Sequence, residues 1–159
     1  MKYLLDTDAF SDIVRSVPNV AARFSSVSAS LVRITTVTTK EIEFGRQRHP
    51  ERASRYGAAI DKLLKSVESL PFDIEDAYAT GQLRAVLTNA GTPIGPYDVM
   101  IAGTALARGL ILVTANAREF SRVPNLQIEN WRLDLSEVRE PPGEYRIARV
   151  GRRRMAFAA

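Results

Sequence analysis

The chain has 159 residues, 45% hydrophobic and 25% charged, a composition typical of a single globular domain with its own hydrophobic core. It has no cysteine and one histidine, which excludes disulfides, thiolate metal sites and a histidine-rich zinc site. The net charge is +4, and chemistry in this chain has to rest on carboxylates, hydroxyls and basic side chains.

The positive charge is concentrated at the end of the chain. Residues 132–159 contain seven arginines and four acids, so we expect a basic C-terminal extension that either contacts a polyanion or is solvated. No apolar run approaches the roughly 20 residues that span a bilayer. The apolar run after Met1 is too short for a secretory signal, so we expect a cytoplasmic protein with no membrane partner.

The first part of the chain alternates between strand and helix patterns. YLLDT, from Tyr3, predicts a short buried strand, and a helix follows for which Asp8 is a candidate N-cap. LVRITTVT (31–38) is rich in β-branched residues and predicts a second strand. TKEIEFGRQR then predicts a helix that Pro50 interrupts, and residues 51–67 have helical apolar spacing.

The second part continues the alternation. SLPFD predicts a short extended segment, and Asp73 caps a helix that ends near Gly91. PYDVMIAGTALARG predicts a helix with Pro96 near its start and Gly109 after its end. LILVTA is a strong strand pattern, NAREF predicts one helical turn, and LQIENW predicts a last strand.

Strands separated by helices predict an α/β fold: a mostly parallel central sheet of about five strands between two layers of helices. Ligands of such folds bind at the carboxyl ends of the strands. Asp6 follows the first strand, Glu41 and Asp98 lie in the first turns of two helices, and Asn116 and Glu119 follow the strand LILVT. Four distant segments therefore deliver acids to one expected edge.

An all-oxygen cluster of this kind suits Mg²⁺ or Mn²⁺, because a cation neutralises carboxylates that otherwise repel one another. Each acid also has a local interpretation. Asp8 fits an N-cap, Thr38 and Glu41 fit a capping box, and Asp98 fits a helix-dipole contact. The metal site is favoured because the local interpretations require several independent coincidences.

A phosphatase is a minor alternative. Asp6-Thr7-Asp8 fits the first motif of the haloacid-dehalogenase-like enzymes, but Phe10 stands where that motif usually has Thr or Val. No lysine follows Lys65, and no Asp-Asp or Glu-Asp pair follows a strand at the place that these enzymes require.

Three segments carry a resemblance to a known family: LLDTD, EIEFG, and the long block from GTPIGPYD to ENW. They resemble the PIN-domain ribonucleases, in particular the VapC toxins of bacterial toxin–antitoxin pairs. The similarity runs from Met1 to Trp131, so we expect a PIN domain over 1–131 and an extension over 132–159.

The resemblance implies a function and a site. It implies an endoribonuclease that hydrolyses RNA phosphodiesters with a metal-activated water, using Mg²⁺ or, as a substitute, Mn²⁺. Thr7 and Thr114 match positions whose hydroxyls support the acids. The implied metal ligands are Asp6, Glu41, Asp98 and Glu119, with Asn116 completing the catalytic set.

The resemblance also implies partners: a VapB-like antitoxin that inhibits the toxin, and a homodimer within a larger toxin–antitoxin complex. Three positions depart from the family pattern, because Asp8, Tyr97 and Ala115 stand where relatives usually carry other residues. A catalytically silent PIN-fold module that binds RNA or protein is the alternative from a different class. Arg46, Arg48, Arg118 and Arg122 are candidates for phosphate contact.

Overall fold

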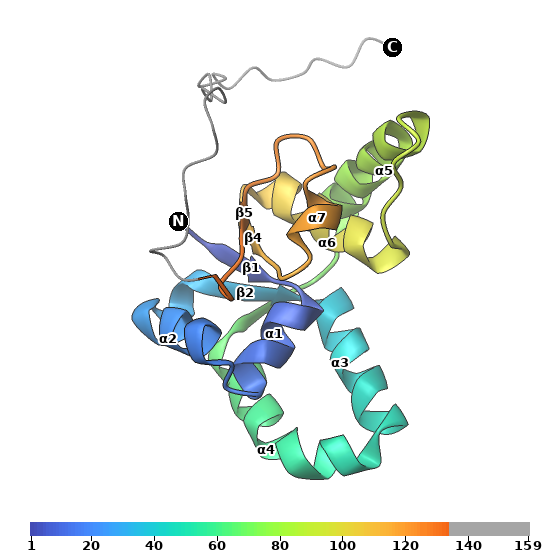
Figure 1. The fold of residues 1–159 in the computed structure, drawn as a ribbon. Helices are drawn as coiled ribbons and strands as arrows, with labels where there is room; N and C mark the ends of the chain where they lie inside the picture. Colours follow the sequence, from blue (N-terminus) through green and yellow to red (C-terminus); the bar gives the residue numbers. More distant parts are fainter. Residues whose placement is uncertain (134–159) are drawn as a thin grey trace.

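A computed structural model describes residues 1–133, and the predicted extension from residue 134 onward lies outside the described residues. Its centre is a sheet in which every neighbouring pair of strands is parallel (Figure 1). The spatial order is β3-β2-β1-β4-β5. The strands are β1 (Tyr3–Leu5), β2 (Val32–Thr35), β3 (Glu68–Leu70), β4 (Ile111–Val113) and β5 (Ile128–Glu129). The predicted parallel α/β class is confirmed.

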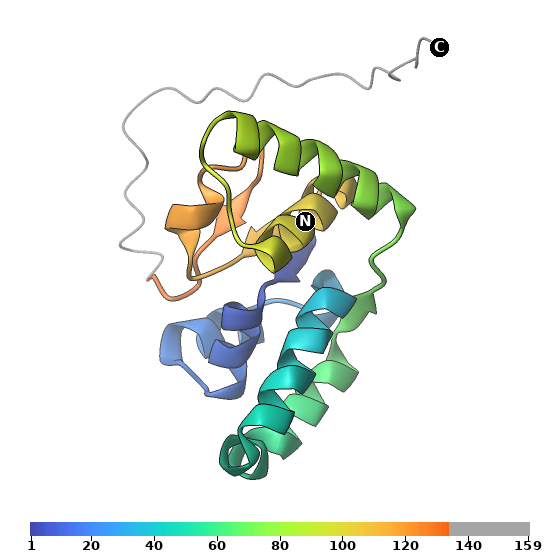
Figure 2. The same ribbon diagram turned by 90° about the vertical axis from the view of Figure 1, so that its right-hand side faces the viewer.

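Helices cover both faces of the sheet, as the three-layer prediction requires. One face carries α1 (Thr7–Val14), α2 (Pro18–Ser26) and α4 (Pro50–Ser66), and the other carries α5 (Ile74–Asn89), α6 (Pro96–Arg108) and α7 (Ala117–Phe120). α3 (Thr36–Arg48) contributes to both cores, and the 3₁₀ turn Ala29–Leu31 precedes β2. Figure 2 shows α3 and α4 side by side as a hairpin that projects away from the sheet.

Alternation along β1 divides the core into two clusters. Leu4 points into the cluster formed with α5, α6 and α7, while Leu5 points into the cluster formed with α1, α2 and α4. Both are fully buried, because a parallel sheet is covered on both faces. This burial holds the strand that delivers Asp6 to the carboxyl edge.

Two helix starts differ from the sequence prediction. The residue at the N-cap of α1 is Asp6 rather than Asp8, and Asp6 accepts the Ala9 backbone N–H at 2.7 Å. The second strand ends at Thr35, because the Thr35 hydroxyl caps α3 by accepting the Thr38 N–H at 3.0 Å. Thr38 is therefore inside the helix, and the local alternative for Glu41, a capping box with Thr38, is wrong.

The small residues of α6 pack within this chain. Ala102, Gly103 and Ala105 are buried, and a Cβ built on Gly103 would lie 2.9 Å from the backbone of Thr80 in α5. These small residues allow α6 to approach α5 closely.

Gly103→Ala is expected to destabilise the fold by about 1–3 kcal/mol, since an added methyl in a closely packed interface forces the backbone apart. Gly81→Ala, in the neighbouring helix α5, is the matched control because its Cβ would meet nothing within 4 Å. We expect that control to stabilise the protein by about 0.5–1 kcal/mol, as alanine is the better helix former. Urea unfolding of both variants measures the difference, and equal effects would contradict the packing assignment.

The described part of the chain ends against α1. Arg132 donates from Nε to Asp12 Oδ2 at 2.5 Å and from Nη2 to Asp12 Oδ1 at 3.0 Å, and Asp12 is buried. Arg15 donates to the same carboxylate at 2.7 Å. Arg132, which the sequence assigned to the extension, is thus attached to the folded domain. Within residues 1–133 no helix has the length and apolar character needed to cross a membrane.

Candidate active site

Asp6 lies at the carboxyl edge of the sheet, between the ends of β1 and β4. Its backbone N–H donates to Val113 O at 3.1 Å, and the residue, which is the N-cap of α1, is 5% exposed. The side chain of the buried Thr114 lowers the pKa of this carboxyl group and so favours its ionised form. Asp6 is therefore fixed by a strand, a helix start and a neighbouring loop.

Asp98 lies in the first turn of α6, directly beside Gly95. A Cβ built on Gly95 would lie 2.7 Å from Asp98 Oδ2, so only glycine leaves the carboxylate in this position. Gly95 is the N-cap residue of α6 and supplies no side-chain cap. The glycine thus determines where the Asp98 carboxylate can lie.

Glu119 connects α7 to the loop before α6. Its carboxylate accepts the Gly95 backbone N–H at 3.0 Å and the Asn116 side-chain amide at 2.8 Å. These bonds, led by the one from Gly95, hold the pKa of Glu119 below its usual range. Asn116, which the resemblance assigns to the catalytic set, therefore orients the Glu119 carboxylate.

Glu41 reaches the site from α3. Its carboxylate accepts a hydrogen bond from the hydroxyl of Thr7, the first residue of α1. This bond links two helices that begin after neighbouring strands, β2 and β1. Of the two hydroxyl residues expected to support acids, Thr7 donates to Glu41, and Thr114 lowers the pKa of Asp6.

Electrostatics show that these acids share one region. Burial, with smaller contributions from the charges of Asp8 and Asp98, raises the pKa of Asp6 to about 7. Burial likewise raises the pKa of Asp98 to about 6, together with the charges of Glu119, Glu41 and Asp8. Asp8, which the sequence analysis took as a cap, is thus an exposed member of the acid cluster.

The donor chemistry of the cluster fits a hard divalent cation, since all its donors are oxygens and its carboxylates disfavour their own ionisation. The side chains do not form a completed cage. Within the described part of the chain, no three acids or histidines stand where they could share one ion. Metal binding therefore requires side-chain rotation in acids that the backbone already brings to one edge.

The raised pKa values predict a pH-dependent stability in metal-free buffer. Folded Asp6 and Asp98 hold protons that the unfolded chain releases near its ordinary carboxyl pKa, so these groups favour folding at low pH. Their contribution is lost as the pH rises from about 4 towards 7. Asp6→Asn, which keeps an N-cap side chain, should show a smaller fall in melting temperature over this range in EDTA. An identical fall in both proteins would contradict the assignment.

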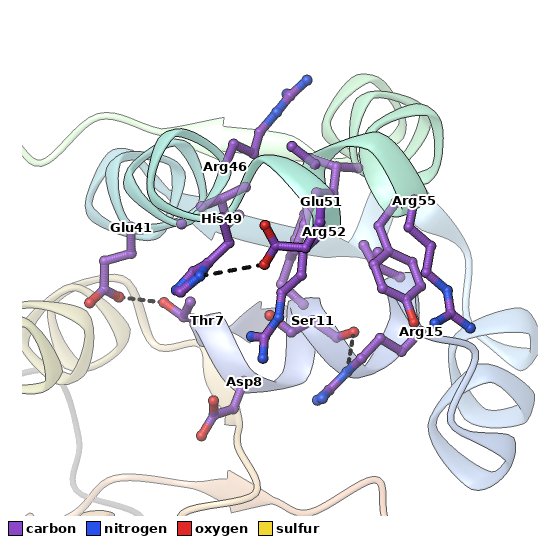
Figure 3. Close-up of a pocket in the computed structure, with 17 residues that line it drawn as sticks. Thr7, Asp8, Ser11, Arg15, Glu41, Arg46, His49, Glu51, Arg52 and Arg55 are labelled. Atoms are coloured by element: carbon purple, nitrogen blue, oxygen red, sulfur yellow. Dashed lines mark hydrogen bonds and ion pairs between the residues drawn. The ribbon is translucent and has the colours of Figure 1, made fainter.

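A groove opens from the acid cluster between α1, α3 and α4 (Figure 3). Its volume is about 730 Å³, and Thr7, Asp8 and Glu41 line its end at the acid cluster. Arginines from α1, α3 and α4 line the rest, together with an apolar floor that includes Phe10 and Ile42. We call this the arginine groove.

The predicted phosphate contacts are placed differently by the structure. Arg46 lines the groove but is bound to Asp61 at 2.8 Å, and Arg122 donates to the carbonyl of Pro93. Arg48 and Arg118 are exposed and do not line the groove. Three other arginines, which no sequence pattern singled out, line the groove: Arg15, Arg52 and Arg55. Their position depends on how α1 and α4 pack, which local sequence does not reveal.

Comparison with known proteins identifies the family. The PIN domain model matches residues 3–126. The tRNA(fMet)-specific endonuclease VapC of Salmonella typhimurium is 38% identical over 133 residues, which cover 82% of this chain and 98% of that protein. Ribonuclease VapC2 of Haemophilus influenzae is 34% identical over 134 residues with the same two coverages.

Solved structures agree. The VapBC complex of Salmonella typhimurium bound to DNA contains a chain that is 38% identical with a TM-score of 0.74, over 82% of this chain and 98% of that one. A chain in the DNA-bound VapBC2 of Rickettsia felis is 28% identical with a TM-score of 0.74, over 82% and 99%.

The fold and the acid cluster define a PIN-domain protein, and the chain belongs to the PIN domain family. Within that family it is a ribonuclease of the VapC type, which sets aside the phosphatase alternative. These two relatives are matched over 98% of their own length, but the match covers only 82% of this chain. The rest of this chain has no counterpart in the match.

Proposed function

We propose that this chain is the toxin of a toxin–antitoxin pair and acts as a Mg²⁺-dependent endoribonuclease. The observation that carries the proposal is the acid cluster: the carboxylates of Glu119, Glu41 and Asp8, from three other segments, raise the pKa of Asp98 in a chain of the VapC type. Such mutual repulsion is destabilising by itself. It is explained when the cluster exists to hold a cation.

The metal would be held by Asp6, Asp98, Glu41 and Glu119, with Mn²⁺ as an effective substitute for Mg²⁺. When bound, the metal supplies an activated water and stabilises charge on the phosphodiester. The protein supplies orientation. Asn116 and the Gly95 N–H hold Glu119, and the Thr7 hydroxyl holds Glu41.

The substrate class is RNA, and transfer RNA is the first candidate. The Salmonella typhimurium relative is named a tRNA(fMet)-specific endonuclease, and it aligns with this chain over 98% of its length. We propose the same initiator tRNA as the first substrate to test. Specificity depends on surface shape and charge around the acids rather than on the acids themselves.

The partners would be a VapB-like antitoxin and a second copy of this chain. The antitoxin is proposed because the similar structures are VapBC complexes. A protein-covered surface is supported by α5, which exposes Ile74, Tyr78 and Val86 to 64%, 68% and 51%. Large apolar side chains at that exposure are typical of a surface that a partner covers.

The test is cleavage of initiator tRNA and of total cellular RNA by the purified chain, with Mg²⁺ in one arm and EDTA in the other. We expect discrete products with Mg²⁺ and none with EDTA. Products that persist in EDTA, or none from either RNA with Mg²⁺, would contradict a metal-dependent ribonuclease. The absence of products from both RNAs would favour the silent PIN-fold binding module.

A further inference from the structure

The arginine groove contains cations that form no ion pair within residues 1–133. Arg46 pairs with Asp61 at 2.8 Å and with Glu43 at 3.9 Å, and Arg15 pairs with the buried Asp12. Neither Arg52 nor Arg55 forms an ion pair with any residue of 1–133. These two arginines are therefore the charges available to a ligand.

Both arginines lie on the first turns of α4, three residues apart, and both are exposed. Residues at that spacing are neighbours on one helix face. Figure 3 shows the Arg52 side chain extending across the groove towards α1, where Asp8 and Ser11 lie, and Arg55 further from the acids. The two guanidinium groups thus stand in sequence along a path that begins at the acid cluster.

We propose that Arg52 and Arg55 bind the phosphates of the RNA strand on one side of the cleaved bond, so that the strand lies in the arginine groove. This inference rests on the proposed ribonuclease function. It adds the direction in which the bound RNA strand extends away from the acid cluster. An acidic site repels RNA, so attraction has to come from cations close to it. Arginine suits this role because its planar guanidinium donates two hydrogen bonds to one phosphate.

The groove favours a nucleic-acid strand over a protein segment for a geometric reason. It is continuous with Thr7, Asp8 and Glu41, so a strand whose phosphodiester lies at the acids has to continue along one of the surfaces that meet there. Tyr56 also lines the groove, with the Arg55 guanidinium 5.2 Å from its ring centroid. An aromatic ring beside an arginine suits an unpaired base next to a bound phosphate.

Binding and cleavage should be measured separately. Fluorescence anisotropy with labelled initiator tRNA, on an Asp98→Asn background that leaves the RNA intact, measures binding without cleavage. Arg52→Ala/Arg55→Ala is compared with Arg84→Ala/Lys65→Ala, which removes two positive charges from exposed positions outside the groove. Melting temperatures verify that both variants fold.

We expect the groove variant to bind at least about tenfold more weakly at moderate salt. The plot of log affinity against log salt has a negative slope. Its magnitude should decrease by about 0.7 for each phosphate of a single strand that the variant no longer binds. Arg52→Lys/Arg55→Lys should keep most of that slope, because the charge remains. The control should keep the parental slope. A purely structural role for the arginines would leave the slope unchanged.

Equal affinity and slope in the groove variant and its control would overturn the proposal, as would no RNA binding by the parent. An RNA affinity that is unchanged in the groove variant would assign the groove to a protein partner instead. Failure of the proposed function can be distinguished from failure of the groove proposal. The first appears as the absence of Mg²⁺-dependent cleavage by the wild-type chain. The second is measured independently, because anisotropy reports whether Arg52 and Arg55 bind RNA.

Discussion

Asp98→Asn is expected to lose RNA cleavage by about 10²-fold or more and to raise the melting temperature of the metal-free protein. The two effects have one origin. The Asp98 carboxylate is held near Glu119, Glu41 and Asp8, and burial together with these charges raises its pKa to about 6. At neutral pH it is mostly ionised, so a neutral amide of the same shape relieves repulsion while removing a proposed metal ligand.

The control for this variant is Glu75→Gln. Glu75 is an exposed acid in the first turn of α5, so it loses the same charge at a similar helical position away from the site. Its cleavage rate should equal that of the wild-type chain, and its melting temperature should not rise. An Asp98→Asn protein that cleaves at the wild-type rate, or that is destabilised in EDTA, would contradict the account of the acid cluster.

Arg108→Ala is expected to have the largest effect on stability. Arg108, in the last turn of α6, donates to the fully buried Asp76 at 3.0 and 2.8 Å and to Asp73 at 2.7 Å. Its removal leaves the Asp76 charge buried without its partner. We expect a loss of about 3 kcal/mol, the lower end of the range for such pairs because the Arg108 side chain is 28% exposed.

That loss corresponds to a fall in melting temperature of roughly 6–12 °C for a domain of this size. Arg84→Ala, an exposed arginine of α5, is the control and should change the melting temperature little. Arg108→Ala/Asp76→Asn should recover part of the loss, since the buried charge is then absent. If Arg108→Ala and Arg84→Ala have the same melting temperature, the Arg108–Asp76 ion pair does not stabilise the contact between α5 and α6.

The fold was predictable because its signals are local and repeated. Apolar β-branched runs separated by helical spacing require a covered parallel sheet, and that rule alone placed Asp6 and Asp98 at one edge. The boundaries were less predictable where polar residues serve two purposes. Thr35, Thr36, Val37 and Thr38 are β-branched and have high strand propensity, but the Thr35 hydroxyl caps a helix, so the strand is shorter than its composition suggests.

The site was predictable in its acids and not in its surroundings. Asp8 resembled a cap because it precedes a helical pattern, yet the cap is Asp6 and Asp8 adds charge to the cluster. The arginine groove could not be predicted, because Arg52 and Asp8 are far apart in sequence and line the same groove only because α4 packs against α1. The role of Gly95 likewise depends on a distance to Asp98 that no pattern encodes.

The central claim is that the acid cluster binds a divalent cation. It is tested most directly by titrating Mn²⁺ and Mg²⁺ into the metal-free chain while heat and melting temperature are recorded, without RNA. The account predicts saturable binding that raises the melting temperature, weakened at least about tenfold in Asp98→Asn. No heat and no change in melting temperature up to millimolar metal, in a protein that remains folded, would contradict it.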